Sequence, residues 1–180
     1  MGEWIDPRRS ASGRAPRSFA VGYLKGSGDA LVYGALVAAA LCFAAALLYR
    51  NPSPLLGAPV ALYCAYRYYP MVESRRPQLG ADSNGLFIDG LGFLNWADIA
   101  NVELFETSVR SIMLATLRIR LKGPLDDAVA RPQRVEAWRS GMTRVWSRRR
   151  DAAGDRLEVT LHPLSNNPAE LAGRITAFLR

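Results

Sequence analysis

The stretch from Ala30 to Tyr49 places the tightest constraint on the fold. It reads ALVYGALVAAALCFAAALLY, twenty residues without a charge or a proline. An α-helix rises about 1.5 Å per residue, so about 20 residues cross a hydrocarbon core of about 30 Å. A helix that is apolar on every side is either a membrane span or a deeply buried core helix. We expect a span, because a chain of 180 residues has little room to bury such a helix. A cleaved signal peptide fits poorly, because 29 residues precede the run and no clear cleavage site follows it.

A second, weaker apolar run extends from Pro54 to Val72. Its uninterrupted apolar part ends at Tyr66, and the run contains Pro59 and, near its end, Arg67. The tyrosines gathered at that end are typical of a membrane interface; they are Tyr63, Tyr66, Tyr68 and Tyr69. We predict a second span and thus a transmembrane hairpin over residues 30–72. An interfacial or re-entrant segment is the alternative for so short a run.

The charges around the hairpin predict its orientation. The basic residues that flank it are Arg8, Arg9, Arg14, Arg17 and Lys25 before the first run, and Arg67, Arg75 and Arg76 at the end of the second. The turn between the runs has only Arg50. The positive-inside rule then places both termini and the soluble part in the cytoplasm. The two cysteines, Cys42 and Cys64, fall inside the apolar runs, so we expect small lipid-buried residues rather than a disulfide.

The net charge of +7, from 23 Lys and Arg against 16 Asp and Glu, is densest beside the apolar region. This distribution favours an anionic membrane surface over nucleic acid as a partner. Residues 1–29 form a basic segment whose first 20 residues are rich in Arg, Ser, Ala and Gly, and we predict that this segment is disordered.

Residues 77–180 have the pattern of a soluble α+β domain. Apolar residues alternate with polar ones at 117–121 and 157–161, and shorter apolar pairs at 86–88, 91–93 and 102–104 indicate further strands. Asn167, Pro168 and Glu170 form the start signal of a C-terminal helix. We therefore expect a curved antiparallel sheet or partial barrel that is closed by this helix.

Two short motifs carry a family resemblance. They are Asn84-Gly85-Leu86-Phe87-Ile88-Asp89 and Gly92-Phe93-Leu94-Asn95-Trp96-Ala97-Asp98-Ile99. Over about residues 30–180 the chain resembles small bacterial membrane proteins in which a PH-like domain follows two transmembrane helices. The resemblance implies a multi-pass protein of the bacterial cytoplasmic (inner) membrane and a W-x-D-I corner in which Trp96 is a core residue. It does not imply phosphoinositide binding.

Residues 131–150 depart from that family pattern. In RPQRVEAWRSGMTRVWSRRR the apolar residues recur at helical spacing among seven arginines and one glutamate; they are Val135, Trp138, Met142, Val145 and Trp146. We predict an inserted basic helix. Two roles are open for it: the tryptophans and arginines bind an anionic bilayer surface, or the apolar stripe covers a flank of the sheet.

No motif predicts catalysis, a metal site or a cofactor. The one histidine, His162, lies on the polar side of an alternating strand and is expected to be solvated. We therefore predict a non-enzymatic, membrane-anchored PH-like binding or scaffold module that acts with an unidentified membrane or peripheral protein. The alternative is binding of anionic lipid headgroups, and nucleic acid is not expected. The candidate contact residues are Arg118, Arg120, Lys122, Arg134, Trp138, Arg144, Trp146, Arg148, Arg149 and Arg150.

Overall fold

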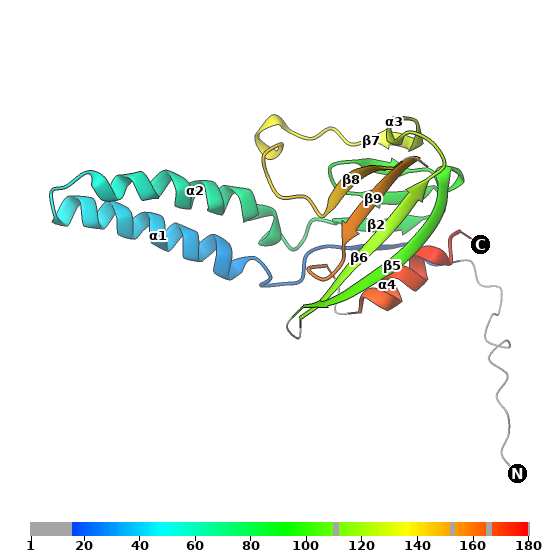
Figure 1. Ribbon diagram of the computed structural model, residues 1–180, viewed down its shortest axis with the longest axis horizontal. Helices are drawn as coiled ribbons and strands as arrows, with labels where there is room; N and C mark the ends of the chain where they lie inside the picture. Colours follow the sequence, from blue (N-terminus) through cyan, green and yellow to red (C-terminus); the bar gives the residue numbers. More distant parts are fainter. Residues whose placement is uncertain (1–15, 110–111, 152–153, 165–166, 180) are drawn as a thin grey trace, which may run out of the picture.

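A computed structural model describes residues 16–109, 112–151, 154–164 and 167–179. It consists of a helical hairpin and a β-domain (Figure 1). The hairpin comprises α1 (Asp29–Leu48), a 3₁₀ turn η2 (Ser53–Leu56), α2 (Gly57–Tyr68) and a second 3₁₀ turn η3 (Tyr69–Met71). The two α-helices lie side by side and project away from the β-domain.

Small side chains form the contact between α1 and α2. Ala39 of α1 and Ala58 of α2 are buried, and a Cβ on Gly57 would lie 3.1 Å from the sulfur of Cys42. Small residues let two helices approach closely, which is the common mode of packing in membranes. Most of the large side chains of both helices are therefore exposed, and Val32 at the base of α1 is buried.

Only α1, among the residues described, is long and apolar enough to cross a membrane, a test that a signal sequence would also pass. The prediction of a second full-length span is not supported, because α2 has 12 residues. Prolines set its limits. Pro59 lies in the first turn, where a missing N–H costs nothing, and Pro70 has no N–H to continue the helix, so the chain passes into the 3₁₀ turn η3.

Sheet A contains the shorter strands in the order β1-β2-β3-β4-β7, all antiparallel. Their bounds are β1 (Phe19–Val21), β2 (Leu79–Asp82), β3 (Gly85–Ile88), β4 (Gly92–Leu94) and β7 (Val129–Pro132). Strand β1 corrects the prediction that residues 1–29 are disordered. Phe19 pairs with Ala81 and Val21 with Leu79, so this segment belongs to the β-domain. Residues 1–15 lie outside the described part of the chain.

Sheet B contains the longer strands in the order β5-β6-β9-β8, again antiparallel. They are β5 (Ile99–Val109), β6 (Ile112–Leu121), β8 (Trp146–Asp151) and β9 (Gly154–Thr160). Strands β6 and β9 confirm the strands predicted from alternation, and β5 confirms the strand predicted from the apolar pair at 102–104. In the described residues the strands form two separate sheets and do not close into a barrel.

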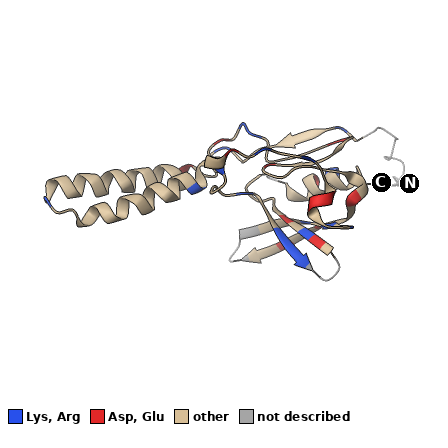
Figure 2. Ribbon diagram, turned by 90° about the horizontal axis from the view of Figure 1, so that it is seen from above, with Lys and Arg blue, Asp and Glu red and all other residues tan. Residues whose placement is uncertain are grey.

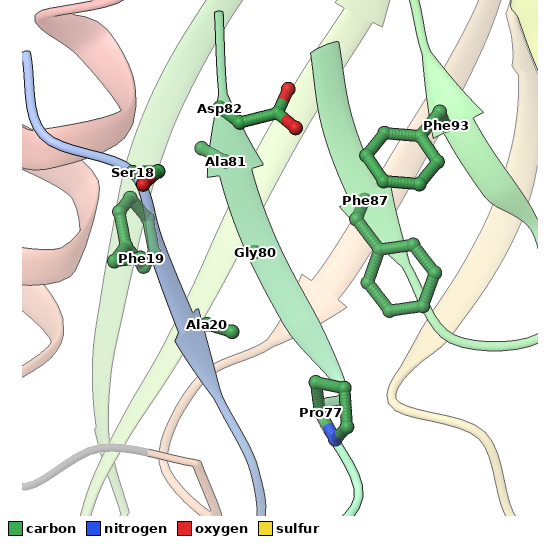
Figure 3. A pocket seen from close by; sticks show the side chains of 9 residues that line it. All are labelled: Ser18, Phe19, Ala20, Pro77, Gly80, Ala81, Asp82, Phe87 and Phe93. Carbon is green, nitrogen blue, oxygen red and sulfur yellow. The ribbon is translucent and has the colours of Figure 1, made fainter. Parts of the chain in front are cut away.

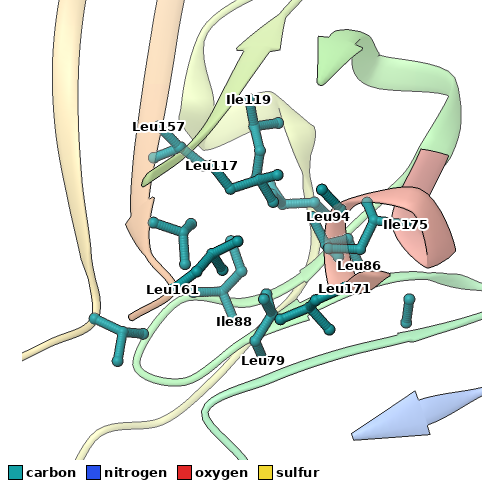
Figure 4. Packing of buried hydrophobic residues seen from close by; sticks show 14 of the residues in the cluster. Leu79, Leu86, Ile88, Leu94, Leu117, Ile119, Leu157, Leu161, Leu171 and Ile175 are labelled. Carbon is teal, nitrogen blue, oxygen red and sulfur yellow. The ribbon is translucent and has the colours of Figure 1, made fainter. Parts of the chain in front are cut away.

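The inner faces of both sheets share one core with the C-terminal helix α4 (Pro168–Thr176). Figure 4 shows Leu171 and Ile175 of α4 beside aliphatic side chains of the strands. The predicted cap is confirmed, because the Asn167 side chain accepts the backbone N–H of Glu170 at 3.1 Å. Trp96, in the 3₁₀ turn η4 (Trp96–Asp98), stacks on Phe178 with ring centroids 5.3 Å apart.

The predicted helix over residues 131–150 is wrong. This stretch contains the end of β7, a single 3₁₀ turn η5 (Ala137–Arg139) and most of β8. Pro132 and Gly141 oppose a continuous helix, and the β-branched and aromatic residues that follow favour an extended chain. Pairing with β9, in which Trp146 lies opposite Val159, then fixes β8 as a strand. A short helix α3 (Leu125–Ala128) precedes this region.

The hairpin is inserted between β1 and β2, which are neighbours in sheet A. Residues 133–145, here named the docking loop, also fasten it to the β-domain. The backbone N–H of Thr143 donates to the carbonyl of Arg67 at 2.8 Å, and the Tyr66 hydroxyl donates to the carbonyl of Trp138. Arg139 forms an ion pair with Glu73 at 2.9 Å. The hairpin is therefore connected to the β-domain at three places: after β1, before β2 and at the docking loop.

Candidate functional site

The outer face of sheet B gathers charged side chains from three strands. Because alternate residues of a strand point to opposite faces, the buried Leu117, Ile119 and Leu157 place their neighbours outward. The register sets Arg118 opposite Glu158, and Arg156 opposite both Arg120 and Arg149. We name this set the arginine face; it consists of Arg118, Arg120, Arg149, Arg156 and Glu158.

Glu158 is the centre of the arginine face. Its carboxylate lies 3.6 Å from Nε of Arg118, 3.5 Å from Nη2 of Arg156 and 3.6 Å from Nε of Arg149. The Arg118 guanidinium also lies 3.9 Å from the ring centroid of Phe105, a side chain that is 45% exposed. One carboxylate therefore faces three guanidinium groups, and positive charge remains in excess.

A hollow of about 120 Å³ opens beside this cluster, lined by Asn101, Glu103, Arg118, Arg120 and Arg156. The Asn101 amide donates to the Glu103 carboxylate at 2.7 Å. With Glu103 included, four arginines stand against two glutamates. An arginine surface of this kind suits carboxylate or phosphate oxygens, which a planar guanidinium can bind with two N–H groups.

Arg148 and Arg150 do not belong to the arginine face. They alternate with Arg149 along β8 and lie toward Asp155 of β9, at distances of 2.5 Å from Arg148 Nη2 and 3.7 Å from Arg150 Nε. Asp155 is buried and also accepts the backbone N–H of Leu125 at 2.7 Å. The hydrogen bond from Arg148 and the one from Leu125 lower the pKa of Asp155. Arg148 therefore stabilises the edge of the domain, and the exposed Arg150 adds a weaker ion pair.

The remaining predicted contact residues are dispersed. The Lys122 ammonium donates to the carbonyl of Ala97 at 2.7 Å. In the docking loop, Arg134 and Arg144 are exposed, and the Trp138 ring is 52% exposed beside the hairpin. Trp146 Nε1 donates to the carbonyl of Asp89 at 2.9 Å, which fixes its ring within the β-domain. The ten residues therefore do not form one surface.

Arg156 is the arginine of the arginine face that the predicted set lacks, and Glu158 is absent from that set as well. The alternation around Leu157 and Val159 places Arg156 and Glu158 on the same polar face of their strand. That signal could have found it. Its position beside Arg120 depends on the pairing of β6 with β9, and no local pattern reveals that pairing.

The outer face of sheet A carries an apolar groove instead (Figure 3). The rings of Phe87 and Phe93 lie 5.2 Å apart beside the bare backbone of Gly80, and Ala20 and Pro77 complete the wall. A Cβ on Gly80 would lie 2.9 Å from the carbonyl oxygen of Phe19. The two sheets therefore expose outer faces of different chemistry.

No group of three His, Cys, Asp or Glu side chains that could hold a metal ion occurs among the described residues. His162 is exposed in the turn after β9 rather than on the strand itself. Partial desolvation lowers its pKa.

No family model, no curated protein and no solved structure matches the chain.

Proposed function

We propose that the protein is a membrane-anchored, non-enzymatic interaction module in which the hairpin lies in the bilayer and carries a PH-like β-domain at the cytoplasmic surface. One observation carries the proposal. The hairpin projects from the β-domain with large apolar side chains on its surface, among them Leu41, Leu47 and Leu56. So large an apolar surface is rarely left in water.

The dimensions and charges of the hairpin support this placement. At about 1.5 Å per residue, the 20 residues of α1 match a hydrocarbon core of about 30 Å. The charged residues of 29–71 are Asp29 and Arg67 at the base and Arg50 at the tip. Figure 2 shows no charged segment between them. Placed in a bilayer, the hairpin would bury no charge in the hydrocarbon.

The pairing of β1 with β2 bears on topology, because residues joined in one sheet lie on the same side of a membrane. If α1 enters the bilayer, α2 and its flanking 3₁₀ turns bring the chain back. A cleaved signal sequence is less compatible with this arrangement. Removal of α1 would take away β1 and Tyr23, a core residue that is 5% exposed. Basic residues at the base and a single arginine at the tip favour a cytoplasmic β-domain.

The arginine face is the surface that we assign to a partner, and its chemistry favours an acidic protein segment. Arginine is enriched in protein interfaces, and the exposed Phe105 adds apolar area beside the charges. Headgroup binding through residues 131–150 has weaker support. Arg148 and Arg150 are paired with Asp155, and β8 extends away from the hairpin, so its last residues lie far from the proposed bilayer.

Membrane insertion can be tested by replacing Val37 and Leu41 with Arg in the full chain. A charge at the centre of a span costs about 2.5–3.5 kcal/mol, so the double variant should leave the urea-washed membrane fraction. Ala130→Arg, on the exposed surface of β7, is the matched control and should stay with the membranes. A double variant that remains in the washed membranes would contradict the proposal.

Topology can be tested with a reporter that is active only in the cytoplasm. The reporter should be active when fused after Arg180 and inactive when placed at Ser53.

Partner binding can be tested with the full chain in neutral phosphatidylcholine nanodiscs and a labelled poly-glutamate peptide as the probe. Changing Arg118, Arg120, Arg149 and Arg156 to Gln should weaken binding about tenfold or more, with a steep dependence on salt. Changing Arg134 and Arg144 to Gln is the control and should have little effect. If the chain ignores the peptide but binds vesicles that contain phosphatidylglycerol, the lipid alternative is the better account.

A further inference from the structure

A second candidate site lies where the hairpin leaves the β-domain. It is a hollow of about 390 Å³ with walls from three segments. Val32 and Leu36 come from the first two turns of α1, Leu62 and Ala65 come from α2, and Trp138 and Met142 come from the docking loop. Met142 is buried, and Gly141 beside it lets the loop approach, because a Cβ there would lie 2.9 Å from the Tyr66 hydroxyl.

Three aromatic residues line the hollow, and two of them, Tyr66 and Trp138, have their polar atoms engaged, while the third, Tyr69, is 45% exposed. The hydroxyl of Tyr66 donates to the carbonyl of Trp138, and the indole Nε1 of Trp138 donates to the carboxylate of Glu136. The remaining lining side chains named above are hydrocarbon or thioether. The hollow therefore offers a ligand van der Waals contact and little hydrogen bonding, which suits an apolar chain rather than a polar metabolite.

The hollow is continuous with the apolar surface of the hairpin. Leu36 and Leu62 line it and are 43% and 44% exposed, and the half-exposed Trp138 forms its rim. If the hairpin lies in the bilayer, the first turns of α1 and the last turns of α2 lie near the headgroups. Tryptophan favours that level, because its ring is apolar and its N–H is polar.

We propose that this hollow holds one acyl chain of a membrane phospholipid, packed between the base of the hairpin and the docking loop. The inference rests on the proposed membrane insertion. Because the docking loop belongs to the β-domain, the lipid joins the two parts of the molecule. A bilayer chain is the occupant that the continuous apolar surface favours.

Contact between Trp138 and a lipid acyl chain can be tested by tryptophan emission of the full protein in nanodiscs of phosphatidylcholine with brominated acyl chains. Bromine quenches a tryptophan that it touches. Quenching is the loss of emission in brominated relative to unbrominated lipid. Trp138→Phe should lose most of the quenching that the wild type shows. Trp146→Phe is the control and should keep that quenching, because the Trp146 indole bonds to Asp89 inside the β-domain. Equal quenching in the wild type and Trp138→Phe would overturn the proposal.

Occupancy of the hollow can be tested by native mass spectrometry of the protein released from mild detergent. The wild type should retain a single phospholipid, and Ala65→Phe, which fills the hollow, should lose it. Val60→Phe adds the same ring on the exposed side of α2 and should keep the lipid. A wild-type protein without lipid, or a dimer without lipid, would overturn the inference while membrane insertion stands. Failure of the wild type to fractionate with membranes would overturn the proposed function itself.

Discussion

The hairpin and the β-domain bury opposite kinds of side chain. In the β-domain, large aliphatic residues such as Leu117 and Leu157 have no exposed surface. In the hairpin the buried positions include Ala39, Ala58 and Ala65, while Leu47 is 79% exposed. The large apolar side chains of the β-domain are thus buried in its core, whereas most of those in the hairpin are exposed. The difference teaches that the β-domain carries its own hydrophobic stabilisation, whereas the exposed apolar surface of the hairpin is the feature that the proposed bilayer would cover.

Truncation of a large apolar residue should therefore have opposite outcomes in the two regions. Leu117→Ala should lower the free energy of unfolding of the β-domain by about 2–5 kcal/mol, because it leaves a cavity in the core. Leu47→Ala should leave it unchanged. Urea unfolding of the full chain in detergent, followed by tryptophan emission, measures both values. A similar loss for the two variants would remove the distinction between the regions.

Tyr23, in the segment between β1 and the hairpin, should make the β-domain sensitive to alkali. Burial, with a smaller contribution from Asp89, raises its pKa from 10.0 to about 12. The folded state therefore favours the neutral hydroxyl. The free energy of unfolding keeps its full value below pH 10 and falls as the pH rises from 10 through 12. The loss should approach about 3 kcal/mol.

Tyr23→Phe isolates this contribution, because phenylalanine cannot ionise. Its free energy of unfolding should fall less than that of the wild type between pH 10 and pH 12, measured by urea unfolding at each pH. The variant should be no less stable at pH 8, because none of the described residues supplies a hydrogen bond to the buried Tyr23 hydroxyl. Parallel pH curves for the two proteins would show that Tyr23 is not buried.

The joint between the two regions should be weakened by Tyr66→Phe, which removes the hydrogen bond to the Trp138 carbonyl. The expected cost is about 0.5–1.5 kcal/mol, confined to docking of the loop. Amide hydrogen exchange should accelerate in residues 133–145 and stay unchanged in β6 and β9. Tyr63→Phe, an exposed position on the same helix, should change neither. Faster exchange throughout sheet B would mean that the loop supports the core itself.

The N-cap of α4 should distinguish the two kinds of helix, with an effect similar in size to that of Tyr66→Phe. Asn167→Ala removes the cap of α4 and should destabilise the β-domain by about 1 kcal/mol, while Asn167→Ser should retain most of the stability. Thermal unfolding measures both. Helix α1 has Gly28 at the corresponding position and no side-chain cap, so Gly28→Ala would not test the same interaction. An unchanged melting temperature for Asn167→Ala would show that the packing of Leu171 and Ile175 suffices.

The sequence predicts these regions to different extents, for physical reasons. Length and composition are local properties, so α1 is evident from Ala30–Tyr49 alone. Alternation likewise predicts β6 and β9, and the Asn-Pro-x-Glu signal predicts α4. Strand β1 has three residues in an Arg- and Ser-rich stretch, and only its pairing with β2 makes it a strand. Strand β8 has apolar spacing that suits a helix, yet pairing with β9 determines its conformation.

The candidate site follows the same division. Arg118 and Arg120 are predicted because their strand alternates clearly. In a helix, Arg148, Arg149 and Arg150 would be spread around the axis in steps of about 100°, but in a strand the middle one faces away from the other two. The two-residue period of the strand therefore places Arg149 on the arginine face and directs Arg148 and Arg150 toward Asp155. The hollow beneath the docking loop depends on contacts between residues more than 60 positions apart, such as Tyr66 and Trp138, and no sequence pattern predicts it.

The insertion of the hairpin between β1 and β2 has a consequence for the order of events during synthesis. Strand β1 leaves the ribosome first, but its partner emerges only after the entire hairpin has been made. The edge of β2 that pairs with β1 therefore stays open until the hairpin is complete and, if the hairpin inserts into a bilayer as proposed, until α2 has returned to the side from which α1 departed. A chain whose α2 stayed on the far side would leave Leu79 without Val21, and the core without Tyr23. If the hairpin inserts into a bilayer as proposed, completion of the sheet would show that it has inserted correctly, and proteolytic susceptibility of Phe19–Val21 would reveal chains in which it has not.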